Sequence, residues 1–147
     1  MPNLTERRRI PFSQQQIFDM VADVEKYPAF LPRILASRVR HREGDAVYVD
    51  MLLGFGILRR RIGSIGVLSP PSRIDITSGD PPFRHLGLHW SFKPGTDGET
   101  VVALHAEFEF RSTLWQRLFD AYFKVEVAGM VDAFEGRARQ IYAAPRS

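Results

Sequence analysis

The segment Asp23–Ile34 reads DVEKYPAFLPRI and follows residues that have the pattern of a short helix. Its two prolines prevent a regular helix, because proline lacks an N–H group and its ring clashes with the preceding turn. Loops are normally polar and lie on the surface, yet this one carries Tyr27, Phe30 and Leu31. A stiff apolar loop predicts a cover over an apolar interior. It acts either as the lid of a cavity or as closure of a packed core.

The residues before this loop predict a strand and a short helix. Residues 3–10 have the pattern of a strand, and Ser13 followed by Gln16 has the spacing of a capping box, which marks a helix start. Apolar side chains then recur at helical spacing until about Asp23, at Ile17, Phe18, Met20 and Val21.

From about residue 36 to residue 110 the pattern changes to strands. Apolar residues alternate with polar ones through residues 47–55, 86–92 and 102–110. Turn residues rich in glycine, proline and aspartate separate these runs at 43–45, 70–72, 79–82 and 94–98. Strands joined by short turns predict an antiparallel meander.

Residues 113–142 contain no proline and predict one long helix, because apolar side chains recur at three- and four-residue spacing. The apolar arc is wider than packing on one surface requires. Gly129 within it costs roughly 1 kcal/mol relative to alanine, which predicts that another group approaches the backbone there. The expected fold is therefore α+β. A curved antiparallel sheet of about seven strands wraps around the long C-terminal helix, with two short helices after the first strand, in a single domain of residues 1–147.

The composition is that of an ordinary globular protein, with 44% hydrophobic and 25% charged residues. The absence of cysteine excludes disulfides, thiolate nucleophiles and cysteine-ligated metals. No apolar run has the length of a membrane span, and the first residues lack the apolar core of a signal peptide. These features predict a cytoplasmic, most simply bacterial, protein.

The formal net charge is +3, and the basic residues are mostly arginine, with the triplets 7–9 and 59–61. Two interpretations stay open at this point. The arginines attract phosphates of anionic lipids or of nucleic acid, or they form solvated strand faces without a partner. A net charge this small does not decide between them.

The sequence contains no recognisable catalytic constellation. No nucleophile elbow, phosphate-binding loop or dinucleotide fingerprint occurs. His85 and His89 share one strand face and could ligate a metal, but Trp90 marks the opposite face as the inward one, so we expect the histidines to face solvent. Glu107 and Glu109 also share a strand face, where paired-acid catalysis is conceivable. We expect both to face outward, because Ala106, Phe108 and Phe110 take the inner face. We therefore expect no enzyme activity, no metal and no required cofactor.

Glu126 is the one acid set among the apolar residues of the predicted long helix. Two interpretations remain: a salt bridge at the helix edge, or a polar contact to the head group of a bound ligand.

Four segments together resemble one family: DVEKYPAFLPRI at 23–34, GFGILRRR at 54–61, PPFRHLGLHWSF at 81–92 and VDAFEGRARQIY at 131–142. They resemble the coenzyme Q-binding branch of the START-like, helix-grip superfamily. This branch also holds polyketide cyclase/dehydrase-like proteins and a bacterial ribosome-association toxin. The family often has a further aromatic residue and a cysteine where this chain has Ala29, Arg33 and Ile34, and a glycine at the position of Pro81.

The resemblance implies a non-catalytic protein that holds ubiquinone or a related isoprenoid lipid between sheet and helix and supports respiratory electron transport. It implies a cytoplasmic protein with peripheral contact to an anionic inner membrane or to respiratory complexes. Lys26 and Arg33 beside the loop are candidates for contact with phospholipid head groups. The alternatives are a ribosome-associated toxin that blocks subunit association and a polyketide cyclase-like enzyme.

The predicted cavity residues come from three parts of the chain. We expect the loop to supply the mouth, and the sheet and the long helix to supply the walls. The residues are Tyr27, Phe30 and Leu31 from the loop, Trp90, Phe108 and Phe110 from the sheet, and Phe119, Phe123, Val127, Met130 and Phe134 from the helix.

Overall fold

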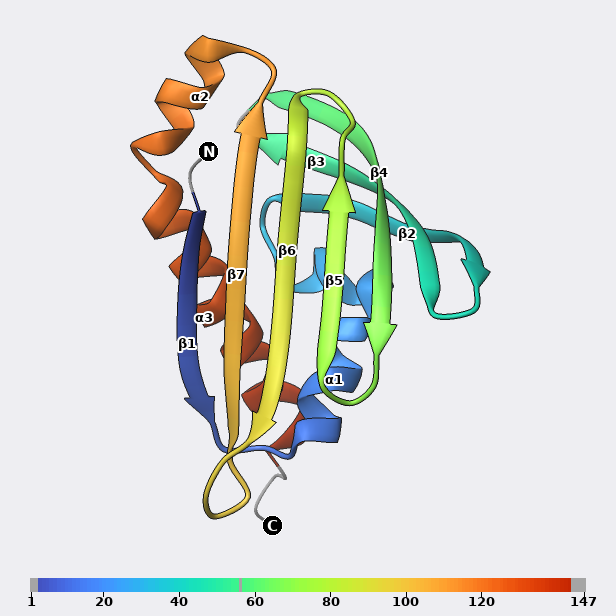
Figure 1. The fold of residues 1–147 in the computed structure, drawn as a ribbon, viewed down its shortest axis with the longest axis vertical. Coiled ribbons are helices and arrows are strands. Elements are labelled where there is room, and N and C mark those ends of the chain that lie inside the picture. The colour runs from blue at the N-terminus through green and yellow to red at the C-terminus, as the bar shows by residue number, and fades with distance from the viewer. Residues whose placement is uncertain (1–2, 56, 144–147) are drawn as a thin grey trace.

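The protein consists of a curved antiparallel sheet with helices on its concave side (Figure 1). The structure is a computed structural model that describes residues 3–55 and 57–143. In chain order the elements are β1 (Asn3–Ile10), α1 (Gln14–Ala22), the 3-10 helix η1 (Val24–Ala29), β2 (Ile34–Glu43), β3 (Ala46–Phe55), β4 (Leu58–Ser69), β5 (Arg73–Ser78), β6 (Phe83–Pro94), β7 (Thr100–Phe110), α2 (Thr113–Asp120) and α3 (Phe123–Tyr142).

The seven strands form one sheet in the order β1-β7-β6-β5-β4-β3-β2. Strands β2 to β7 form a meander in which each strand pairs with the next, as the short turns predict. Strand β1 instead pairs with β7, so that Asn3 lies opposite Glu107. The long helix α3 runs behind β1, β7 and β6 in Figure 1. This arrangement confirms the predicted α+β helix-grip fold.

The start of α1 confirms the predicted capping box. The backbone N–H of Gln16 donates to the Ser13 hydroxyl at 3.2 Å, and the Gln16 side-chain oxygen accepts from the Ser13 N–H at 3.0 Å. These two bonds satisfy N–H groups that a helix start leaves without partners. All four apolar side chains predicted for this helix are buried. Helix α1 is followed directly by η1, which contains Tyr27 and Pro28.

The predicted continuous helix over residues 113–142 is wrong at its centre, because the chain forms two helices separated at Ala121 and Tyr122. The N–H of Tyr122 donates to the carbonyl of Phe119 at 2.9 Å, three residues back, so the turn tightens there. Helix α2 has no buried residue, whereas α3 buries five of its side chains. The two helices therefore share a periodic sequence but have different environments.

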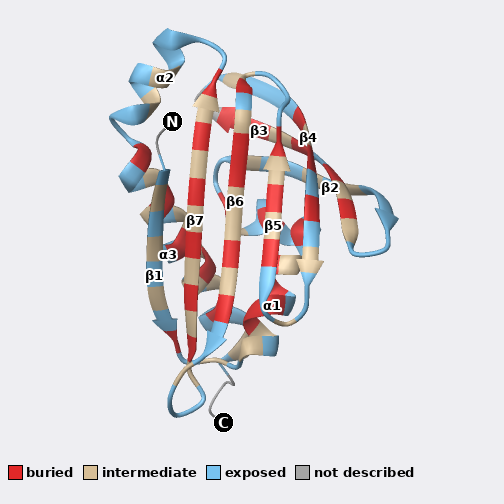
Figure 2. Cartoon of the chain, in the orientation of Figure 1, coloured by how far each residue is buried: buried red, intermediate tan, exposed pale blue. Residues whose placement is uncertain are grey.

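The core lies between the concave face of the sheet and helices α1 and α3 (Figure 2). Strand β7 alternates strictly between buried and half-buried residues along its whole length. Trp90 on β6 is almost completely buried. Its ring meets the ring of Phe134 on α3 edge-on, and the two ring centres are 4.9 Å apart. Aromatic contacts of this kind add to the stability that apolar burial supplies, and they fix α3 against the middle of the sheet.

Candidate ligand cavity

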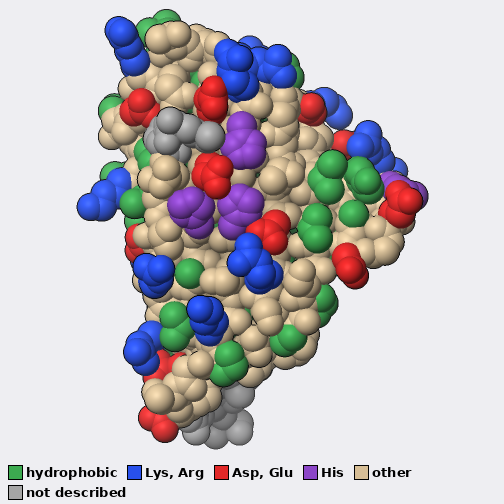
Figure 3. Space-filling model, viewed as in Figure 1, with side chains coloured by type: hydrophobic (Ala, Val, Ile, Leu, Met, Phe, Trp, Pro, Cys, Tyr) green, Lys and Arg blue, Asp and Glu red, His purple; other side chains and the backbone are tan. Residues whose placement is uncertain are grey.

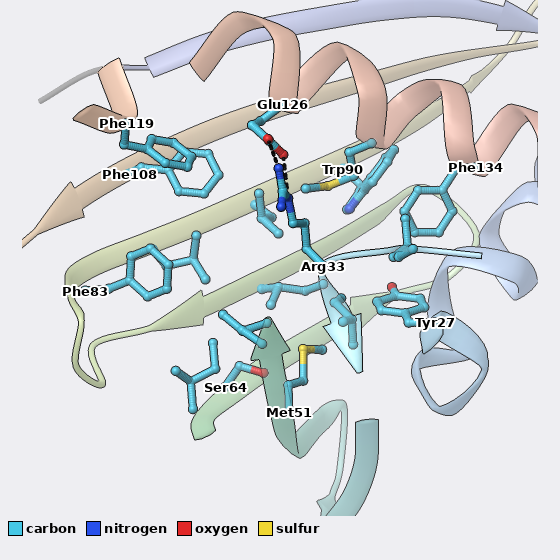
Figure 4. A pocket seen from close by; sticks show the side chains of 18 residues that line it. Tyr27, Arg33, Met51, Ser64, Phe83, Trp90, Phe108, Phe119, Glu126 and Phe134 are labelled. Atoms are coloured by element: carbon cyan, nitrogen blue, oxygen red, sulfur yellow. Dashed lines mark hydrogen bonds and ion pairs between the residues drawn. The ribbon is translucent and has the colours of Figure 1, made fainter. Parts of the chain in front are cut away.

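A cavity of about 110 Å3 lies between the sheet and α3 (Figure 4). Strands β2 to β7 supply most of its wall, and η1, the following loop, α2 and α3 supply the rest. The wall is almost entirely apolar. Its polar side chains are Ser64, Tyr27, Arg33 and Glu126, and it contains no histidine. Such a wall suits an apolar ligand and offers few hydrogen bonds that could orient the ligand.

The apolar loop within Asp23–Ile34 lies over one end of the cavity. Tyr27 and Leu31 are buried and line the cavity. The Tyr27 hydroxyl donates a hydrogen bond to the carbonyl of Val21, and its ring meets Phe134 edge-on at 5.4 Å. Burial, with a smaller contribution from nearby Asp23, raises the pKa of Tyr27 well above its usual value. The loop therefore forms part of the cavity wall and also closes the core. Both predicted roles, the cover of a cavity and the closure of a packed core, are present in the structure.

Phe30 takes the outer position in the same loop. Its ring packs on Phe134 at 5.1 Å, and the guanidinium of Arg137 lies over it at 5.3 Å from the ring centre. A cation over an aromatic face stabilises the contact further. Phe30 thus fastens the loop to α3 from outside, and it does not line the cavity.

An ion pair forms the polar edge of the cavity. Arg33 Nη2 lies 2.7 Å from Glu126 Oε1, and Arg33 Nε lies 3.4 Å from Glu126 Oε2. The hydrogen bond to Glu126 raises the pKa of Arg33 further above its already high value. The Arg33 side chain is 50% exposed and that of Glu126 is 29% exposed, so the pair lies where the cavity meets solvent. The salt-bridge interpretation of Glu126 is confirmed, and the pair joins the apolar loop to α3 (Figure 4).

An outer groove of about 470 Å3 continues from the cavity on the other side of this ion pair. The two spaces share five wall residues, and the groove adds Pro32, Val125, Gly129 and Ala133. A side chain added at Gly129 would meet no atom within 4 Å, so the predicted close approach to its backbone is wrong for the chain itself. Gly129 instead widens the groove. The shared residues are Leu31, Arg33, Ile34, Glu126 and Met130.

The structure brings together seven of the eleven side chains predicted for the cavity. They come from the loop, the sheet and the C-terminal helical region, as expected, although that region forms two helices. Whether they contact a ligand stays a prediction. They are Tyr27, Leu31, Trp90, Phe108, Phe119, Met130 and Phe134.

The other four predicted residues do not line the cavity. Besides Phe30, these are Phe110, Phe123 and Val127. Phe123 meets Phe108 edge-on at 5.0 Å, and Val127 is fully buried, so both fill the contact between α3 and the sheet. Phe110 lies beyond the end of the cavity, in a small hollow next to α2. They are apolar for reasons of packing, which periodicity alone does not separate from lining a cavity.

The largest group that sequence reasoning missed comes from the inward faces of β3 to β6. Some of them, such as Met51, Leu53 and Leu86, lie in alternating runs of the sequence, but nothing local shows which inward side chains face empty space. They are Met51, Leu53, Ile62, Ser64, Ile76, Phe83, Leu86 and Leu88; Ile34, Arg33 and Glu126 complete the set.

The predicted outward position of the strand histidines is confirmed. His85 and His89 lie on the convex face of the sheet with His105, and all three approach the carboxylate of Glu107, at 3.2, 3.5 and 3.6 Å respectively (Figure 3). Glu109 also faces outward and pairs with Arg84 at 3.2 Å. Among the described residues, no group of three or more potential ligands is arranged to hold a metal ion. No helix in the described ranges is long and apolar enough to cross a membrane.

Comparisons with known proteins agree with this geometry. The family described as polyketide cyclase / dehydrase and lipid transport matches residues 10–135. The chain is 30% identical over 133 residues to the ribosome association toxin RatA of Pseudomonas aeruginosa, and the match covers 90% of this chain and 92% of that protein. It is also 30% identical over 142 residues to the mitochondrial coenzyme Q-binding protein COQ10 homolog B of Xenopus laevis, covering 94% of this chain and 58% of that protein.

Solved structures give the same result for the fold. The 18 kDa protein CC1736 from Caulobacter crescentus is 28% identical and superposes with a TM-score of 0.77, covering 98% of this chain and 100% of that one. The Zhui aromatase/cyclase from Streptomyces sp. R1128 superposes with a TM-score of 0.85 over 99% of both chains at 15% identity, a likeness of fold alone. With a family match over most of its length and relatives that include coenzyme Q-binding proteins, the chain belongs to the polyketide cyclase/dehydrase and lipid transport family.

Proposed function

We propose that this protein binds ubiquinone or a similar isoprenoid lipid in its cavity and carries it without converting it, in support of respiratory electron transport. The observation that carries the proposal is the apolar wall, whose one pair of charged side chains lies at the edge. An isoprenoid tail needs an apolar enclosure, and burial of its surface supplies about 25 cal/mol per Å2. The coenzyme Q-binding relatives support the same class of ligand.

The sizes of the two spaces suggest how such a ligand lies. A cavity of about 110 Å3 is small compared with ligand pockets, which usually measure about 300–1,000 Å3. A long tail therefore occupies the inner cavity only in part, or widens it by moving side chains. The outer groove, at about 470 Å3, has room for the remainder. Arg33 lies between the two spaces and can donate hydrogen bonds to the carbonyl oxygens of a quinone head group.

The chemistry of the wall favours carriage over catalysis. Acid–base catalysis needs a titratable group with a free proton or lone pair next to the substrate. The one carboxylate in the wall, Glu126, already accepts two hydrogen bonds from Arg33. A polyketide cyclase-like activity is the alternative that the family name brings. Turnover of a polyketide substrate by the purified protein would decide for it.

The deciding experiment is organic extraction of the purified protein followed by mass spectrometry. We expect a quinone in near-stoichiometric amount, or uptake of added ubiquinone by protein that has been stripped of lipid. Tryptophan fluorescence offers a second readout, because Trp90 lies in the cavity wall. If the protein neither releases a quinone nor takes one up, the carrier proposal is wrong.

A second candidate function follows from the RatA relatives, which match over most of their own length. In that case the protein would bind the ribosome and block subunit association. Overexpression in a bacterial host followed by polysome profiling separates the two functions. We expect normal 70S levels. An accumulation of free subunits would favour the ribosome-directed function.

A further inference from the structure

A stripe of exposed apolar side chains runs along α2 and into the start of α3. Helix α2 has no buried residue, and its exposed side chains Leu114 and Leu118 are one helical turn apart. Tyr122, at the break between the helices, and Val125, in the first turn of α3, follow them in the chain. These four side chains are 51–70% exposed. Large apolar groups this exposed usually lie singly on a surface, so four of them within twelve residues of the chain point to an interaction site.

The turn between β3 and β4 extends this surface at the same end of the molecule. Ile57 in that turn is 96% exposed. The next residues of β4, Leu58 and Arg60, line a small hollow together with Trp115 and Phe119 of α2, which shows that the turn and the helix are neighbours. Figure 1 shows α2 and the start of β4 at the upper end of the molecule. We call the stripe together with Ile57 and Trp115 the apolar end.

Basic side chains surround the apolar end. Arg60 on β4, Arg117 on α2 and Lys124 on α3 are exposed, and none of them forms an ion pair with a described residue. Figure 3 shows Lys and Arg side chains at the upper end of the face drawn there. Exposed cations beside exposed apolar groups fit a partner that offers negative charge at its surface and hydrocarbon beneath it.

The apolar end leads to the ligand site. Val125, the last residue of the stripe, lines the outer groove next to Glu126, and Phe119 of α2 lines the inner cavity. A surface that docks at the apolar end would therefore lie at the opening through which a lipid enters. The exposed apolar residues therefore lie where a docked membrane would face the opening of the ligand site.

We propose that the apolar end is a docking surface for a lipid bilayer that contains anionic phospholipids. Aliphatic side chains such as Leu114, Leu118 and Ile57 gain free energy by entering the acyl region. Ribosomal RNA would favour aromatic and arginine side chains that stack on bases, and most of this row is aliphatic. The proposal goes beyond the proposed function, because it does not depend on which lipid the cavity holds.

The test is flotation of the full chain with phosphatidylcholine vesicles that contain or lack phosphatidylglycerol. We expect binding to the anionic vesicles and weaker binding at high salt. The double variant Leu114→Asp/Leu118→Asp should bind on the order of 30-fold more weakly, because two buried apolar groups are lost. Arg60→Ala and Arg117→Ala should each weaken binding about fivefold.

Matched controls use the same changes elsewhere on the surface. Ile65 and Val67 on β4 are 40% and 43% exposed and lie far from α2 in the sheet. Ile65→Asp/Val67→Asp should leave vesicle binding unchanged, as should Arg42→Ala near the β2–β3 turn. Circular dichroism checks the fold of each variant, which is expected to persist because the changed side chains are exposed.

Three results would overturn the proposal: no flotation of the wild type with anionic vesicles, undiminished flotation of Leu114→Asp/Leu118→Asp, or an equal loss in the control variants. Co-sedimentation with ribosomes that depends on Arg60, without flotation, would assign the surface to RNA instead. Vesicle binding by a protein that neither yields a quinone on extraction nor takes up added ubiquinone would leave the docking surface in place and refute only the carrier function.

Discussion

Replacing Ser64 with leucine tests whether the space between the sheet and α3 is truly empty. Ser64 is a buried residue of β4 in the cavity wall, and its hydroxyl makes only a long hydrogen bond of 3.5 Å to the Val49 carbonyl. An unfilled cavity of 110 Å3 destabilises a fold by about 2.6 kcal/mol, at roughly 24 cal/mol per Å3. A leucine side chain would fill part of that space. We expect the free energy of unfolding to rise by about 1–2 kcal/mol.

The same substitution should weaken ligand binding, because leucine takes the volume that a lipid tail would use. Chemical denaturation measures the first effect, and thermal unfolding should shift upward by about 3–6 °C. Titration with ubiquinone, followed by the fluorescence of Trp90, measures the second effect. We expect an affinity at least about tenfold lower, which corresponds to about 1.4 kcal/mol.

The sign of the change in the free energy of unfolding shows whether the space beside Ser64 is empty or filled. A leucine forced into a filled core costs about 1–3 kcal/mol, whereas a leucine that enters a void stabilises the fold. Ser91→Leu, on the outer face of β6, is the matched control and should leave ligand affinity unchanged. A Ser64→Leu protein that is less stable than the wild type and still binds ligand with full affinity would refute the reasoning.

Three other substitutions probe the loop, the ion pair and the helix start. Arg33→Ala should lower the free energy of unfolding by less than about 1 kcal/mol, because the pair with Glu126 is partly exposed. It should nevertheless speed ligand release in stopped-flow measurements, and an unchanged rate would argue against a role at the opening. Tyr27→Phe should cost about 1–2 kcal/mol by leaving the Val21 carbonyl without its donor. The folded state keeps the Tyr27 proton above the ordinary pKa of 10.0, so wild-type stability should fall as pH rises beyond that value, and denaturation of the variant should show a smaller fall. Ser13→Ala should lower stability by about 1 kcal/mol in urea denaturation, and no loss would show that the cap is dispensable.

The order of elements was predictable because its signals are local. The capping box at Ser13, the alternation along β7 and the turns between strands each depend on a few neighbouring residues. The break at Ala121 and Tyr122 had no such signal. Neither residue is a strong helix breaker, and apolar spacing continues across them. The two helices differ only in what they pack against, and a sequence window does not contain that information.

The cavity itself was predictable only in outline. Val127 and Met130 are both apolar residues of α3, yet one is packed against its neighbours and the other lines the empty space. Which of the two applies depends on how the helix is rotated against the sheet. The ion pair between Arg33 and Glu126 joins residues 93 positions apart. The sequence marks each residue as a candidate, but their contact depends on the tertiary fold.

The pairing of β1 with β7 has a consequence for the newly made chain on the ribosome. Strand β1 leaves the ribosome before its partner β7, which lies about a hundred residues later in the chain, and Arg8 of β1 also bonds to Asp132 and Glu135 on α3. At about 5–20 residues per second, β1 waits roughly 5–20 s for β7 to be made. During that time its hydrogen-bonding edges are unpaired, and the charged triplet Arg7-Arg8-Arg9 discourages pairing with other chains. We therefore expect replacement of Arg7 and Arg9 by uncharged residues to increase aggregation during synthesis more than it changes the stability of the folded protein.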